Sequence, residues 1–145
     1  MIKEDRGYPT ISCMIYDCYI KNALCDLGAS VNIMSKVIFE RLGYPTLDPT
    51  LMTVQLADST LRYPEGIVRQ LLLKIRGTYI LADFVVLEEE GDVEMPLILG
   101  RPFVTAANAR IYVGEGVIQL RIGKKSLKFK FQRRDEQCYR IDQNT

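Results

Sequence analysis

The stretch Leu24-Cys-Asp-Leu-Gly-Ala-Ser30 places one carboxylate, Asp26, directly after an apolar run and two residues before a glycine. Burying a carboxylate among apolar residues is costly for structure alone. Gly28 and Ala29 leave room for another backbone or a ligand to come close. Two interpretations fit this pattern: Asp26 is a functional carboxylate, or it caps a turn after a strand. The local sequence does not choose between them.

The chain around this stretch is typical of an all-β domain. Its apolar runs are short and rich in β-branched residues, and Gly, Pro or Asn-Ala breaks separate them. The predicted strands cover residues 10–15, 19–25, 52–57, 60–63, 67–75, 80–87, 117–122 and 126–131.

Residues 35–43 predict the clearest helix, with Ser35 as its N-cap and Gly43 at its end. Residues 105–109 predict a further helical turn. The buried stripe of the first helix is predicted to consist of Val37, Ile38, Arg41 and Leu42.

The absence of histidine from the 145 residues excludes several kinds of site. Ser-His-Asp and Cys-His catalysis need an imidazole, and so do many zinc sites. Chemistry within this chain would depend on carboxylates, thiols, lysines or tyrosines, and the chain has 18 Asp and Glu residues. We therefore expect no metal and no cofactor. The length fits one domain.

The net charge is +1, but the C-terminal end is basic, since residues 121–145 hold eight basic and three acidic side chains. A nucleic-acid patch would be basic in this way. Residues 127–131, however, alternate apolar side chains with lysines, which is the pattern of a half-buried strand with a solvated lysine face. We favour the strand and expect no nucleic-acid partner for this domain.

The four cysteines, Cys13, Cys18, Cys25 and Cys138, form no Cys-x-x-Cys pair and are sparse for a disulfide scaffold. We expect reduced thiols and a cytoplasmic location. No apolar run reaches about 18 residues, so no membrane partner is expected.

The domain boundaries are read from polarity along the chain. Residues 1–9 are interpreted as a flexible N-terminal segment, residues 10–132 as the domain, and residues 133–145 as a polar tail.

Asp26-Leu-Gly-Ala-Ser30 resembles the active-site loop of retropepsins, the aspartic proteases of retroviruses and retrotransposons, whose pattern is Asp-Thr/Ser-Gly-Ala. Leu97-Ile-Leu-Gly100 resembles their second hallmark, an apolar-apolar-Gly turn before a short helix. The amino-acid sequence from about residue 10 to residue 122 is most similar to the protease region of plant Ty3/Gypsy-type retrotransposon polyproteins. The blocks that carry the likeness, in order, are 54–59, 63–67, 83–87 and 96–103.

The resemblance implies an all-β, retropepsin-like closed barrel with a flap hairpin and one or two short helices. Each chain of such an enzyme supplies one catalytic Asp, here Asp26, so the active form would be a homodimer that binds an extended peptide. The implied active-site loop adds Leu27, Gly28, Ala29 and Ser30. The implied flap residues, which would bind substrate, are Ala57, Asp58, Ser59 and Thr60. Ile98, Leu99 and Gly100 would support the loop from behind.

The implied function is endopeptidase cleavage of a polyprotein by two paired carboxylates. Two such charges about 4 Å apart repel by roughly 4 kcal/mol at an effective dielectric of ~20. The pair would therefore hold one shared proton, so that one member activates water and the other protonates the peptide carbonyl oxygen.

Leu27 departs from the family, which has Thr or Ser at this position. That hydroxyl makes a hydrogen bond across the dimer, worth roughly 1 kcal/mol, which would be lost on both chains. This departure motivates an alternative: a catalytically weak or inactive retropepsin-like domain that acts as a dimerisation or peptide-binding module.

Overall fold

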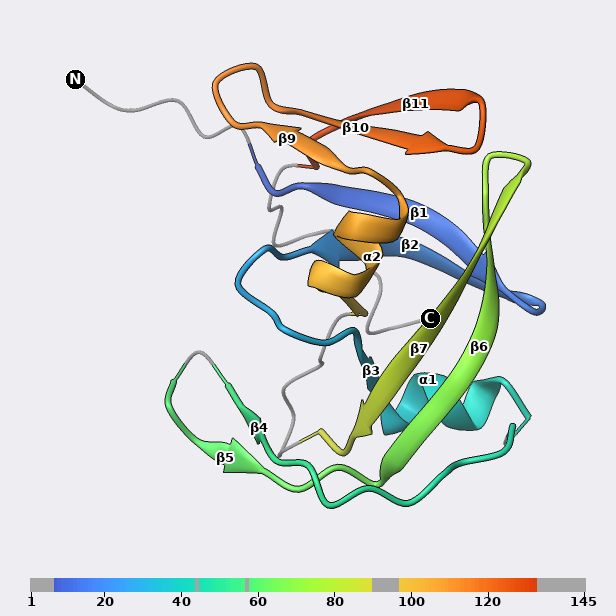
Figure 1. Ribbon diagram of the computed structural model, residues 1–145, viewed down its shortest axis with the longest axis vertical. Helices are drawn as coiled ribbons and strands as arrows, with labels where there is room; N and C mark the ends of the chain where they lie inside the picture. The colour runs from blue at the N-terminus through green and yellow to red at the C-terminus, as the bar shows by residue number, and fades with distance from the viewer. Residues whose placement is uncertain (1–6, 44, 57, 90–96, 133–145) are drawn as a thin grey trace.

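The computed structural model describes residues 7–43, 45–56, 58–89 and 97–132, and over these ranges the chain is built mostly of strands (Figure 1). The strands are β1 Thr10–Ile15, β2 Cys18–Cys25, β3 Ile33–Ser35, β4 Val54–Gln55, β5 Leu61–Arg62, β6 Gly66–Ile75, β7 Thr78–Leu87, β8 Ile98–Leu99, β9 Arg110–Tyr112, β10 Val117–Ile122 and β11 Lys125–Lys130. The helices are α1 Lys36–Arg41 and α2 Arg101–Ala106.

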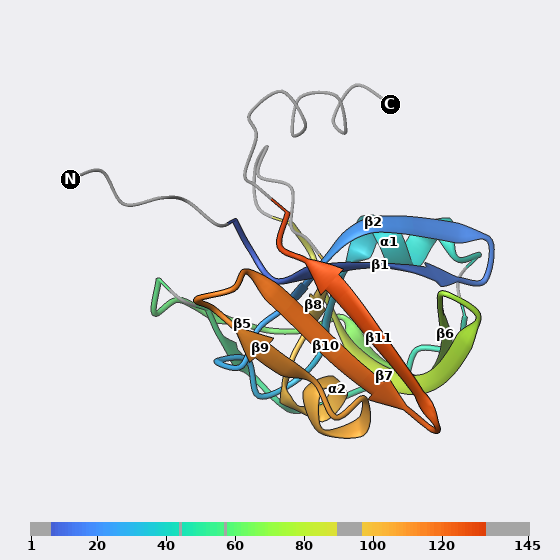
Figure 2. The ribbon, with the colours of Figure 1, turned by 90° about the horizontal axis from the view of Figure 1, so that it is seen from above.

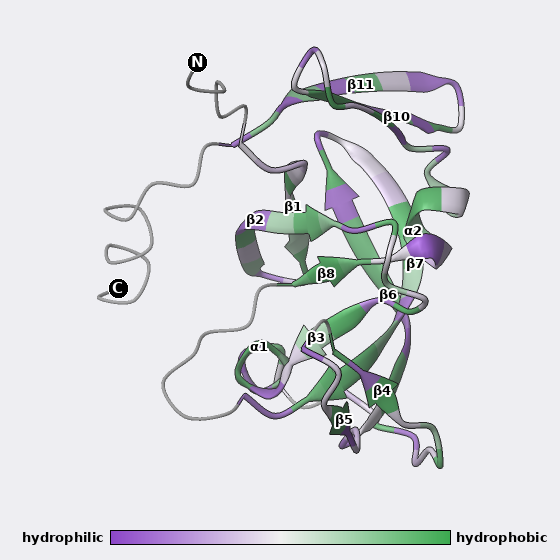
Figure 3. Ribbon diagram, turned by 90° about the vertical axis from the view of Figure 1, so that its left-hand side faces the viewer, coloured by the Kyte–Doolittle hydropathy of each residue, from purple (hydrophilic) through white to green (hydrophobic). Residues whose placement is uncertain are grey.

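Six strands close into a barrel in the order β1-β2-β8-β3-β7-β6. The long hairpins β1–β2 and β6–β7 are antiparallel, whereas β8 runs parallel to β2 and β3 runs parallel to β7. In Figure 3 the strongly hydrophobic β8 lies between β2 and β3. The predicted all-β fold, with a closed barrel and short helices, is confirmed.

A separate three-stranded sheet in the order β11-β10-β9 lies across the barrel, as Figure 2 shows from above. Ile118, Leu120 and Phe129 of this sheet are buried in the main core. The lysines of β11 are exposed, so the predicted lysine face of this strand is confirmed. Tyr8 forms an isolated bridge with Gln132 beside the sheet.

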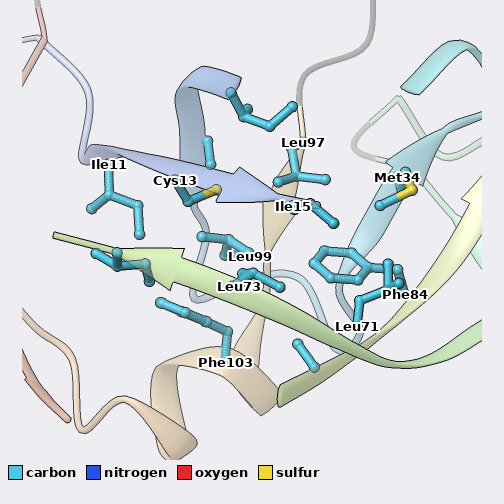
Figure 4. Packing of buried hydrophobic residues seen from close by; sticks show 14 of the residues in the cluster. Ile11, Cys13, Ile15, Met34, Leu71, Leu73, Phe84, Leu97, Leu99 and Phe103 are labelled. Carbon is cyan, nitrogen blue, oxygen red and sulfur yellow. The ribbon is translucent and has the colours of Figure 1, made fainter. Parts of the chain in front are cut away.

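The main core consists of aliphatic side chains and the rings of Phe39, Phe84, Phe103 and Phe129, of which Figure 4 labels Phe84 and Phe103. Residues from β1, β6, β7 and β8 meet there because alternate side chains of each strand point inward. A smaller cluster joins Ile33, Val85 and Leu87 to Val54 of the β4–β5 hairpin. The hairpin is thereby attached to the end of the barrel where β3 begins.

Helix α1 begins as predicted, because Ser35 Oγ accepts a 3.1 Å hydrogen bond from the N–H of Ile38. Its predicted buried stripe is partly wrong. Ile38 and Phe39 are the buried residues, whereas Val37 is 43% exposed and Arg41 is exposed. A helix of six residues is too short for its stripe to be read from periodicity, and its packing against β3 and β7 decides which side is buried.

Residues 1–6 and 133–145, which the sequence assigns to the N-terminal segment and the tail, lie outside the described residues. No helix in the described ranges is long and apolar enough to cross a membrane. Within the same ranges, no three acidic, cysteine or histidine side chains gather as a metal site would require.

Candidate active site

Asp26 stands where β2 ends, and β8 holds it there. Leu24 and Cys25 pair with Ile98 and Leu99, and the N–H of Asp26 donates to the Leu99 carbonyl at 2.9 Å. The two apolar-to-glycine stretches singled out in the sequence therefore lie side by side. Ile98 is half-buried and Leu99 is fully buried behind the loop.

The Asp26 side chain is half-buried, and its Oδ1 accepts a 2.9 Å hydrogen bond from the N–H of Gly28. The backbone carbonyl of Asp26 also accepts from the N–H of Ala29, at 3.2 Å. The carboxylate thus caps its own turn, as one of the two sequence interpretations holds. Its second oxygen makes no hydrogen bond to any described residue, so the cap leaves it available for chemistry.

Gly100 is enclosed by the backbone of the Asp26 loop. A Cβ on this residue would stand 2.3 Å from the Val31 carbonyl oxygen and 2.7 Å from the Ala29 carbonyl oxygen. The next residue, Arg101, donates its backbone N–H to the Ala29 carbonyl at 2.9 Å. A side chain at Gly100 would separate these two segments.

Asn32 belongs to the site although the sequence analysis did not select it. Its side chain is buried, with Oδ1 accepting from the Gly100 N–H at 2.8 Å and Nδ2 donating to the Asp83 carbonyl at 3.0 Å. Its own carbonyl accepts from the Val85 N–H at 2.9 Å. The available signal was one polar residue inside the apolar run 31–34.

The rim of the loop faces solvent. Leu27 is 54% exposed, and Gly28 and Ser30 are exposed. The Leu27 carbonyl accepts a long hydrogen bond, 3.4 Å, from Nη1 of Arg101. An apolar side chain therefore projects from the loop directly beside the carboxylate.

A groove of about 450 Å³ separates the loop from the β4–β5 hairpin. The hairpin and its approach contribute Met52, Val54 and Leu61 to its wall. The other lining residues are Gly28, Ala29, Ser30, Val31, Ile33, Thr53 and Gln55. None of these residues carries a charge, so the groove fits an uncharged ligand surface.

The tip of this hairpin is held by Asp58. Its Oδ1 accepts from the hydroxyl of Thr60 at 2.6 Å and from the Thr60 N–H at 3.0 Å, and these two bonds, the hydroxyl first, lower the pKa of the Asp58 carboxyl. Ser59 takes a left-handed conformation with φ 72°. Asp58, Ser59 and Thr60 are all exposed. Ala57 lies outside the described residues.

Comparison with solved structures relates this arrangement to known proteins. The retroviral protease-like domain of Ddi1 from Leishmania major matches with a TM-score of 0.67 and 22% identity, over 89% of this chain and 98% of that one. This chain has a retropepsin-like fold. EIAV protease, solved with the inhibitor HBY-793, matches at a TM-score of 0.55 and 20% identity, over 78% of this chain and all of that one.

The comparisons by sequence, in contrast to the comparison of folds, gave no match. No protein-family model and no curated protein matches the chain. In the retropepsin-like fold of this chain, Asp26 lies at the end of β2 and beside β8. The sequence motif alone could not establish this position.

Proposed function

We propose that the chain is an aspartic endopeptidase of retrotransposon type that cleaves a polyprotein, with Asp26 as its catalytic residue. The observation that carries this proposal is the place of Asp26, in a loop held by β8 and next to an uncharged groove. The retropepsin-like fold and the resemblance to plant Ty3/Gypsy-type proteases support it. We infer that the natural substrate is an extended segment of the polyprotein.

The active form would be a homodimer, because one chain supplies one such loop and the chemistry needs two carboxylates. The ionised Asp26 takes a proton from water while the water oxygen bonds to the peptide carbonyl carbon. The protonated Asp26 of the second copy gives its proton to the carbonyl oxygen. Collapse of this gem-diol intermediate breaks the C–N bond: the first Asp26 gives its proton to the leaving nitrogen, and one hydroxyl of the intermediate returns its proton to the second Asp26 as the carboxyl group forms.

The β4–β5 hairpin would act as the flap. Its short strands lie across the groove from the loop, and its backbone could pair with an extended peptide in the manner of an added strand. Asp58 would then be a positioning residue that holds the tip of the hairpin through Thr60.

The test is cleavage of peptides drawn from the polyprotein on either side of this chain. The wild-type chain should cleave at acidic pH, pepstatin-type inhibitors should reduce the rate, and Asp26→Asn should abolish it. Asp17→Asn, the same change in the exposed β1–β2 turn, is the matched control and should cleave normally. Cleavage that survives in Asp26→Asn would exclude the proposed mechanism.

The second candidate function is a dimerisation or peptide-binding module without proteolysis. The exposed Leu27 favours it, because no hydroxyl stands there to bridge two loops. A dimer by analytical ultracentrifugation that binds peptide without cleaving it would support this function. A wild-type chain that cleaves, with loss of activity in Asp26→Asn, would exclude it.

A further inference from the structure

A second cavity, of about 170 Å³, lies between the β1–β2 hairpin and the end of β11, separate from the groove beside Asp26. Three cationic side chains line it, those of Lys21, Arg76 and Lys130. Thr10, Ser12 and Tyr19 add hydroxyl groups. No carboxylate lines it among the described residues. Cations gathered in this way repel one another, and a bound anion would relieve the repulsion.

A β-bulge brings Lys21 to this cavity. Ile11 pairs with Ala23 and Cys13 pairs with Ile20, so that Lys21 and its neighbour on β2 together stand opposite the single residue Ser12. Such a bulge interrupts the alternation of a strand and re-aims its side chains. The irregularity of the β1–β2 pair therefore coincides with the cavity wall.

Arg76 occupies a backbone position that arginine rarely takes. It has φ 45° and Gly77 has φ 81°, in the two-residue turn that joins β6 to β7. Turns of this kind favour Asn, Asp or Gly at both central positions. An arginine kept in a disfavoured conformation points to a role for its side chain.

The head of Arg76 is held in place beside the cavity. Its guanidinium carbon lies 3.8 Å from the centroid of the Phe129 ring, and Nη1 donates to the Lys128 carbonyl at 2.8 Å. A stacked guanidinium keeps further N–H donors in its plane, in a geometry that matches the oxygens of a phosphate. The Arg76 guanidinium is therefore positioned before a ligand arrives.

Thr10 supplies a buried donor without a partner. Thr10 is 8% exposed, and its Oγ1 makes no hydrogen bond to any described residue. Buried hydroxyls in folded proteins are usually paired. Oγ1 is itself closed to solvent, so a ligand oxygen in the cavity would meet it only after the Thr10 side chain turned about χ1.

We propose that this cavity binds a small oxyanion of the phosphate class, either inorganic phosphate or the phosphate group of a small phosphomonoester. Lys21, Arg76 and Lys130 neutralise its charge and donate hydrogen bonds to its oxygens. Three cations suit a phosphate better than a single carboxylate. The site does not depend on the proposed protease function.

The test is a titration of the ¹⁵N-labelled full chain with inorganic phosphate, followed by NMR at constant ionic strength. Saturable shifts are expected at the amides of residues 10–12, 19–21, 76–77 and 129–132, with a dissociation constant in the millimolar range. Phosphoserine provides the second arm, and the tighter of the two ligands identifies the natural source of the phosphate. Shifts no larger than those from added chloride would overturn the proposal.

Matched variants distinguish binding of phosphate at this cavity from general attraction of an anion to a positively charged surface. Lys21→Gln and Arg76→Asn should each weaken phosphate binding roughly tenfold, because each removes charged hydrogen-bond donors. Asn also suits the turn conformation, so Arg76→Asn should remain folded. Arg41→Gln removes the same charge from α1 and should leave binding unchanged; equal weakening in all three variants would overturn the proposal.

Discussion

Asn32 Oδ1 lies 2.8 Å from the backbone nitrogen of Gly100, a residue 68 positions further along the chain. The same amide donates to the carbonyl of Asp83 on β7. One buried side chain therefore joins the loop that carries Asp26, the turn after β8 and the strand β7. The position of Asp26 depends on this connection as well as on its own backbone hydrogen bonds.

Asn32→Ala should destabilise the fold by about 2–4 kcal/mol, because it removes two hydrogen bonds and leaves the buried N–H of Gly100 unpaired. Urea unfolding followed by circular dichroism would measure the loss. Asn22→Ala is the matched control, since Asn22 Oδ1 has no hydrogen-bond partner among the described residues, and it should cost far less. Equal losses in both variants would contradict the role assigned to Asn32.

Gly100→Ala should cost about 3 kcal/mol or more, because the new methyl group would meet two backbone carbonyls that cannot move apart without breaking the loop. Gly114→Ala is the control: a Cβ at Gly114 meets nothing within 4 Å. The difference between the two midpoints in urea gives the cost of the clash. A Gly100→Ala variant as stable as Gly114→Ala would mean that the loop is more compliant than its geometry indicates.

The sequence predicted the long strands well because each has its own repeating pattern. The hairpins β1–β2 and β6–β7 carry enough alternating side chains to be recognised locally. β8 and β9 have two and three residues, which is too few for any period, and only their partners define them as strands.

The candidate site was predicted only where residues form a motif. Asp26 and Gly28 are two positions apart in the sequence, and the resemblance to retropepsins linked them to Gly100. Asn32 shows the limit of such reasoning. Both partners of its side chain lie more than 50 residues away, so nothing local distinguishes it from a polar break in a strand.

Leu27→Thr should give a tighter dimer than Leu27→Val, under the proposal that two Asp26 loops meet. Thr and Val have the same shape, so their difference isolates the hydroxyl. Two hydrogen bonds across the dimer, worth about 1 kcal/mol each, predict a dissociation constant roughly 30-fold lower for Thr. Sedimentation equilibrium measures both constants. Identical values would show that this position makes no hydrogen bond between the loops.

The buried thiols predict a loss of stability in alkaline solution. Burial is the main cause that raises the pKa of Cys13 and of Cys25 from 9.0 to about 12, and a neighbouring thiol adds to it in each case. Between these values the unfolded chain loses thiol protons that the folded chain keeps. The free energy of unfolding should therefore fall as pH rises from 9.0 towards 12, by up to about 1.4 kcal/mol per pH unit for each thiol.

Urea unfolding at a series of pH values would measure this slope. The double variant Cys13→Ala, Cys25→Ala is the comparison, because lysine and tyrosine titration affects both proteins alike. Its slope above pH 9.0 should be shallower than that of the wild type. The same slope in both proteins would mean that these thiols titrate equally in the folded and unfolded chains.

Met52 should determine which substrate side chains the groove accepts, if the chain is the proposed protease. It lines the uncharged groove, whereas its neighbour Leu51 is fully exposed and does not. Met52→Ala removes apolar contact surface and should lower kcat/KM for a peptide with Leu at the cleavage site by about tenfold, through a loss of about 1.4 kcal/mol. Leu51→Ala should leave kcat/KM unchanged. Replacing the substrate Leu by Asp should nearly abolish cleavage by the wild type, because no cationic side chain lines the groove among the described residues. Equal effects of Met52→Ala and Leu51→Ala would show that substrate side chains bind elsewhere.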